Sequence, residues 1–87
     1  MIIVMKLLEQ NAIADLVSEK RAINFIAKRN SNKEWVVEFL HVPTTLYGDP
    51  IKKGVRTRRG RKRSFLRLNG VEKFMKLVGA KEFTVIL

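Results

Sequence analysis

The sequence predicts an α+β fold, a small β-sheet with two helices, and three observations lead to this expectation. Several short runs alternate apolar and polar residues, as strands do, and two longer stretches repeat apolar residues at helical spacing. The third observation is size. With 87 residues, of which 46% are hydrophobic, the chain can build one core and no second one. We therefore expect a single domain over residues 1–87.

The first expected elements are a strand and a helix. Residues 2–8 (IIVMKLL) form a short apolar run rich in β-branched residues, which favours a buried strand. Between Asn11 and about Lys20, apolar residues fall near a helical stripe, with Asn11 as the expected N-cap.

A β-hairpin is expected next. Residues 21–29 alternate with a period of two, and residues 34–42 alternate again. The intervening Asn30-Ser31-Asn32 has the composition of a turn. The hairpin predicts one face that carries Trp35, Val37 and Phe39.

The C-terminal part predicts a strand, a helix and a last strand. Residues 64–68 (SFLRL) could form a short strand, and residues 82–87 (EFTVIL) the final one. Between them, Asn69 with Glu72 resembles a capping box, and Gly79 is the expected stop. The apolar stripe of this helix comprises Val71, Phe74, Met75 and Val78.

Apart from the short run at residues 64–68, these elements follow the order βαββαβ, with a basic insertion before the last helix. This is the order of the ferredoxin-like split βαβ sandwich, in which an antiparallel sheet carries both helices on one face. The alternative is a mostly-β barrel with one C-terminal helix, in which residues 11–20 are a strand or a loop.

Positive charge is concentrated in one internal segment. The chain has 18 lysines and arginines against 8 acidic residues, a net charge of +10, yet no acidic residue lies between Asp49 and Glu72. This insertion, about residues 50–67, carries nine basic residues: Lys52, Lys53, Arg56, Arg58, Arg59, Arg61, Lys62, Arg63 and Arg67. The remainder of the chain is nearly neutral, so the sequence indicates a balanced domain with a basic segment inserted.

Such a segment favours phosphate binding. Arginine side chains bond phosphate oxygens in pairs, and Gly54 and Gly60 let a backbone approach closely. Nine like charges repel one another, which favours a partner that neutralises them. The sequence therefore predicts a small nucleic-acid-binding protein, for RNA or DNA, with an accessory or regulatory role. We expect residues 52–63 to be the least ordered part, or else to form a β-ribbon across Arg59-Gly60.

Aromatic residues near the segment are candidates for base stacking. Tyr47 and Phe65 flank it, although Phe65 could equally seat the loop on the body of the domain. Phe25, Trp35 and Phe39 share strand spacing with core residues, which favours burial over a stacking platform.

The remaining residues do not indicate an enzyme. Cysteine is absent, and the single histidine, His41, cannot build a common transition-metal site alone. The carboxylate pairs Asp15 with Glu19 and Glu34 with Glu38 have basic neighbours, as surface charges do. We expect no catalytic residue, no metal and no cofactor. We also expect an intracellular, cytoplasmic protein with no membrane span.

A second class of function remains open. The basic segment could dock on an acidic surface of a protein partner, as part of an inhibitor or an assembly factor. Heparin or bulk nucleic acid should compete poorly with such a shaped protein interface.

Overall fold

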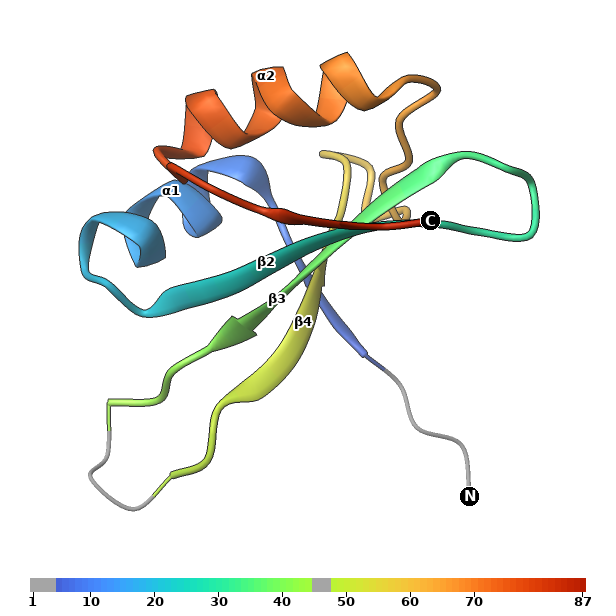
Figure 1. Ribbon diagram of the computed structural model, residues 1–87. Helices are drawn as coiled ribbons and strands as arrows, with labels where there is room; N and C mark the ends of the chain where they lie inside the picture. The colour runs from blue at the N-terminus through green and yellow to red at the C-terminus, as the bar shows by residue number, and fades with distance from the viewer. Residues whose placement is uncertain (1–4, 45–47) are drawn as a thin grey trace.

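Two helices cover one face of a mixed β-sheet (Figure 1). The computed structural model describes residues 5–44 and 48–87, and within them the fold is α+β with five strands. The elements in chain order are β1 (Lys6–Leu8), α1 (Gln10–Ser18), β2 (Ala22–Arg29), β3 (Trp35–His41), β4 (Ile51–Val55), α2 (Leu68–Val78) and β5 (Thr84–Ile86).

The strands lie side by side in the order β1-β4-β3-β2-β5. β3 is antiparallel to both of its neighbours, whereas β1 pairs in parallel with β4, and β2 with β5. Helix α1 connects β1 to β2, and α2 connects β4 to β5, so each connection crosses two strands. β1 runs parallel to β2, and β4 to β5, and parallel strands of one sheet can be joined only by a long crossover, which each helix supplies.

The expected βαββαβ order lacks β4, and the expected antiparallel sheet is a mixed one. The missing strand lies inside the basic segment. Its central residues, Lys52, Lys53 and Gly54, do not alternate between apolar and polar, and strands are recognised by that alternation. The strand expected over residues 64–68 is reduced to a single bridge between Trp35 and Phe65. The barrel alternative is wrong, because residues 10–18 are helical.

The hydrophobic core lies between the sheet and the helices. The helix stripe predicted for α2 is buried in full, and the predicted β3 face is buried with it. Phe25 of β2 stacks on Phe39, with ring centroids 5.2 Å apart. The main core side chains are Ile13, Phe25, Trp35, Val37, Phe39, Val55, Phe65, Val71, Phe74, Met75 and Val78.

Of the three helix ends predicted from the sequence, one is confirmed and two are displaced. Gly79 ends α2 with a φ of 86°, a left-handed conformation that glycine adopts without a steric penalty. The predicted N-caps are displaced. Glu9 rather than Asn11 precedes α1, and Arg67 rather than Asn69 precedes α2, with no side-chain capping bond at either.

The predicted hairpin of β2 and β3 is confirmed. Its turn is held by Asn30, whose Oδ1 accepts hydrogen bonds from the backbone N–H groups of Asn32 and Glu34. A bulge interrupts β2 between Ile23 and Ile26, and Asn24 within it has a φ of 54°.

Across residues 5–44 and 48–87, neither helix is long and apolar enough to cross a membrane.

Candidate functional site

The carboxyl ends of β1 and β4 bring the basic segment to the start of α1. These two strands are parallel, and Leu8 lies opposite Val55. The residues that follow these two strands, Glu9 and Arg56, are therefore neighbours. The backbone N–H of Arg56 donates to the carbonyl of Leu8 at 2.9 Å. The sheet thus sets the first arginine beside the helix that follows β1.

Beyond β4 the chain forms a hydrogen-bonded turn, which we call the basic turn (residues 56–63). The N–H of Thr57 donates to the carbonyl of Arg61 at 2.8 Å, and the N–H of Arg63 donates to that of Val55 at 2.9 Å. Gly60 has a φ of 85°, which explains a glycine at this position. The segment therefore takes the ribbon form. Residues 52–55 are paired strand and residues 56–63 a hydrogen-bonded turn, and the low order expected of residues 52–63 stays a prediction that amide exchange tests.

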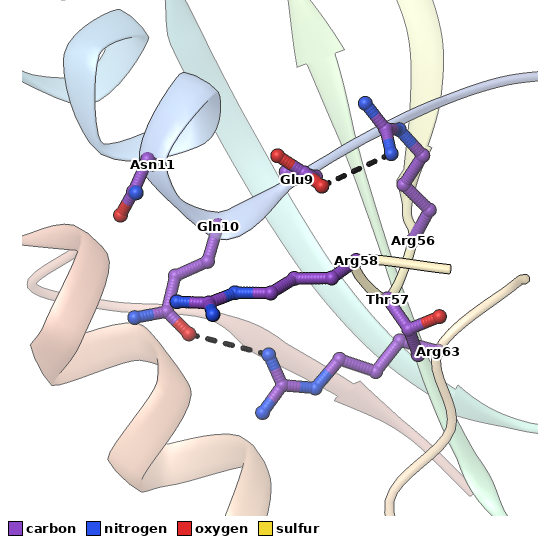
Figure 2. Close-up of a pocket in the computed structure, with 7 residues that line it drawn as sticks. All are labelled: Glu9, Gln10, Asn11, Arg56, Thr57, Arg58 and Arg63. Carbon is purple, nitrogen blue, oxygen red and sulfur yellow. Dashed lines mark hydrogen bonds and ion pairs between the residues drawn. The ribbon is translucent and has the colours of Figure 1, made fainter. Parts of the chain in front are cut away.

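Two arginines at the base of the basic turn are held by the body of the domain. Arg56 Nη1 forms an ion pair with Glu9 Oε1 at 3.1 Å, and Arg63 Nη1 donates to Gln10 Oε1 at 3.2 Å (Figure 2). The Arg63 guanidinium also lies 4.8 Å from the ring centre of Phe65. Both arginines are half-buried. Their contacts fix the base of the ribbon.

A polar cavity of about 290 Å³ opens between this base and the first turn of α1. Arg56, Arg58 and Arg63 line it from one side, and Glu9, Gln10, Asn11 and Thr57 complete the wall. Figure 2 shows the Arg58 side chain directed into the cavity toward Gln10. The first N–H groups of a helix have no intrahelical acceptor and carry a partial positive charge. Three guanidinium groups and a helix start against one carboxylate therefore make this cavity favourable for an anion.

Four cations, with Arg58 of the cavity wall among them, form the far end of the turn, which we call the basic tip. All four side chains are exposed. Within residues 5–44 and 48–87, no carboxylate lies within 4.0 Å of any of them. The basic tip comprises Arg58, Arg59, Arg61 and Lys62.

The other predicted basic residues lie elsewhere. Lys52 and Lys53 are neighbours in β4, so their side chains point to opposite faces of the sheet. Lys52 Nζ lies 3.8 Å from Oε1 of the buried Glu38, on the face without helices. Lys53 is buried against His41, and Arg67 is exposed just before α2. The nine cations therefore do not form one surface.

The aromatic prediction needs correction. The Phe65 side chain is only 8% exposed, and its ring lies 5.6 Å from that of Phe74. It cannot offer a face to a base, and it seats the basic turn on the core instead. Tyr47 lies outside the described residues.

Glu9 and Gln10 were not predicted as site residues. Nothing in their local sequence distinguishes them, because their arginine partners are 47 and 53 residues further along the chain. Among the residues that the structure describes, no three acidic or histidine side chains gather as a metal site would require.

Comparisons with protein-family models, with curated proteins and with solved structures found no match for this chain.

Proposed function

We propose that this protein binds the phosphate backbone of RNA or DNA through the basic turn, in an accessory or regulatory role. The observation that carries the proposal is the basic tip. Its four cations stand on a hydrogen-bonded ribbon, exposed and without a carboxylate partner among the described residues.

The basic turn divides its charges between two tasks. Arg56 and Arg63 form hydrogen bonds with Glu9 and Gln10, and these contacts hold the ribbon in place. Arg58, Arg59 and Arg61 are exposed and have no carboxylate partner among the described residues, so their guanidinium groups can donate to phosphate oxygens, which arginine can bond in pairs. A ribbon that is ordered before binding loses less conformational entropy on contact than a flexible loop.

The cavity at the start of α1 adds a place for one phosphate group. Arg58 lies in the cavity and belongs to the basic tip, so a phosphate there would be continuous with phosphates along the ribbon. Contacts of this kind go to the backbone and not to base edges. We therefore propose binding that depends little on nucleotide sequence and involves no chemical step.

The test compares two triple variants that each lower the net charge of +10 by three. The tip variant carries Arg58→Ala, Arg59→Ala and Arg61→Ala. The control variant carries Lys73→Ala, Lys76→Ala and Lys81→Ala, which removes exposed lysines of α2 and the segment after it. Affinity for short duplexes and single strands of several sequences is measured at low salt. We expect the tip variant to bind all of them at least about tenfold more weakly, as the loss of phosphate contacts predicts, and the control variant to bind nearly as the wild type does.

Two results would contradict the proposal. If both variants lose the same affinity, net charge alone drives binding and the turn has no special role. If the wild type binds neither nucleic acid nor heparin, an acidic protein surface becomes the better partner.

A further inference from the structure

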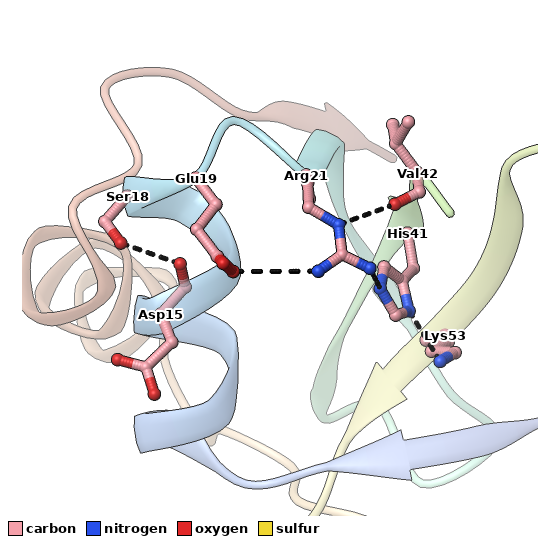
Figure 3. Close-up of polar contacts among 7 residues, drawn as sticks. All are labelled: Asp15, Ser18, Glu19, Arg21, His41, Val42 and Lys53. Atoms are coloured by element: carbon pink, nitrogen blue, oxygen red, sulfur yellow. Dashed lines mark hydrogen bonds and ion pairs between the residues drawn. The ribbon is translucent and has the colours of Figure 1, made fainter. Parts of the chain in front are cut away.

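A second group of cations lies around the single histidine of the chain and includes no residue of the basic turn (Figure 3). Arg21 precedes β2, His41 ends β3 and Lys53 lies in β4. Arg21 Nη2 is 3.2 Å from His41 Nε2, and Lys53 Nζ is 2.6 Å from His41 Nδ1. We call Arg21, His41 and Lys53 the histidine cluster.

The protons of the histidine cluster cannot all be placed favourably. A neutral imidazole has one nitrogen that accepts and one that donates, and a guanidinium can only donate. His41 Nε2 must therefore accept from Arg21, which puts the ring proton on Nδ1. That proton then faces Lys53 Nζ, and a protonated ammonium has no lone pair to accept it. One of the two contacts of His41, with Arg21 or with Lys53, is therefore unfavourable unless the Lys53 ammonium is deprotonated.

The surroundings add positive charge and little negative charge. Lys6 of β1 pairs with Lys53 across the strands, and Arg21 approaches His41 from the start of β2. The carboxylate of Glu19, at the end of α1, is 3.6 Å from Arg21 Nη1 and half-exposed. No other carboxylate among the described residues lies within 4.0 Å of Arg21 or Lys53.

The pKa values respond to this crowding. Burial first, and then the charges of Lys53 and Arg21, lower the pKa of His41. Burial first, and then the charges of Lys6 and Arg21, lower the pKa of Lys53. A bound anion would reverse the electrostatic part of both effects, because it replaces a neighbouring repulsion with an attraction.

We propose that the histidine cluster binds a phosphate group and that His41 takes up one proton from solvent when the phosphate binds. In the occupied site, the Arg21 guanidinium and the Lys53 ammonium turn their donors from the imidazole to phosphate oxygens. The imidazole is then free to hold protons on both nitrogens and becomes a third charged donor. Such charge-assisted bonds are the strong ones for phosphate. Solvent contacts the cluster at Arg21, whose side chain is 27% exposed, and at the partly exposed His41.

The experiment follows the imidazole of His41 by NMR, which needs no assignment by mutation because the chain has one histidine. Its titration is recorded in chloride alone and at equal ionic strength with two probes. One is inorganic phosphate, and the other is a dinucleoside monophosphate, whose single phosphodiester does not titrate near neutral pH. We expect at least one probe to raise the pKa of His41 by about one unit, which corresponds to about tenfold tighter binding to the protonated protein.

The two probes distinguish the source of the phosphate. A response to the dinucleotide indicates a nucleic-acid backbone, whereas a response to inorganic phosphate alone indicates a free phosphate ligand. No shift of the His41 pKa with either probe, up to concentrations that alter the protein's other resonances, would overturn the proposal.

Matched variants locate the site. Lys53→Met removes the ammonium and keeps the aliphatic stem. We therefore expect the probes, followed through the His41 pKa shift, to bind about tenfold more weakly. Lys52→Met removes the same charge from the opposite face of the sheet and should leave the response unchanged. If Lys53→Met fails to fold, Arg21→Gln serves as the same test at a more exposed position. An unchanged response in the folded variant would also refute the site.

The inference does not depend on the basic turn. In the tip variant, the His41 response to inorganic phosphate should persist even where binding of long nucleic acids is lost.

Discussion

The two parts of the basic segment lie in very different surroundings: β4 carries two of its cations and the basic turn carries six. In β4, Lys52 and Lys53 are sorted by the strand to opposite faces of the sheet, one beside Glu38 and the other beside His41. In the basic turn, the cations of the tip lie together in solvent. The comparison shows that charge density along a chain gives an exposed cationic surface only where the backbone leaves the charged side chains in solvent, away from carboxylates.

The largest expected effect concerns the core on which the turn is seated. Phe74→Ala should lower the free energy of unfolding by about 3 to 5 kcal/mol, the usual cost of truncating a buried phenylalanine. Leu77→Ala, in the same helix at a side chain that is 64% exposed, should cost less than about 0.5 kcal/mol. Chemical denaturation measures both. Equal losses would mean that α2 does not face the sheet as described.

Within the basic turn, alanine substitutions of Arg63 and Arg59 should change the free energy of unfolding in opposite directions. Arg63→Ala should cost about 1 to 2 kcal/mol, because its guanidinium lies over the rings of Phe65 and Phe74 and its stem is half-buried. Arg59→Ala should leave the stability unchanged or raise it slightly, since it relieves repulsion among exposed like charges. Thermal unfolding at low salt gives the comparison. A stabilising Arg63→Ala would show that the base of the turn is not held.

The smallest expected effect is a dependence of stability on pH. The unfolded chain binds the His41 proton with a pKa of 6.5, and the folded protein binds it less tightly because that pKa is lowered. The unfolding free energy should therefore fall as the pH drops below 6.5, and stay level above it as far as His41 is concerned. The pKa of Lys53 is lowered from 10.5, so its contribution has the same sign: the free energy of unfolding rises as the pH rises toward 10.5.

His41→Gln isolates the first of these contributions. It should flatten the change in stability between about pH 5 and about pH 8, the range in which histidine titrates. A wild-type protein that gains stability on acidification through this range would contradict the lowered pKa and the repulsion that causes it.

The parts of the fold that the sequence predicted depend on local pattern. The hairpin and α2 follow from alternation, helical spacing and Gly79, all of which lie within a few residues of one another. β4 could not be recognised in this way. Lys52, Lys53 and Gly54 lack strand character alone, and their place is set by pairing with β3 on one side and, on the other, with β1 at the start of the chain.

The candidate site was predicted in part for the same reason. The composition of the segment indicated which residues could meet phosphate, and the basic tip retains four of them. It could not indicate that Lys53 is buried, that Phe65 is core, or that Glu9 and Gln10 hold the arginines at the base. Those outcomes depend on contacts between residues far apart in the sequence.

The most direct test of the central claim is the salt dependence of binding to one duplex, compared between the wild type and the tip variant. Each phosphate contact contributes about −0.9 to the slope of log affinity against log salt. Loss of Arg58, Arg59 and Arg61 should therefore flatten the slope by about two to three units, while the control variant keeps the wild-type slope. A tip variant with the wild-type slope would contradict the claim that the exposed end of the basic turn contacts the phosphate backbone.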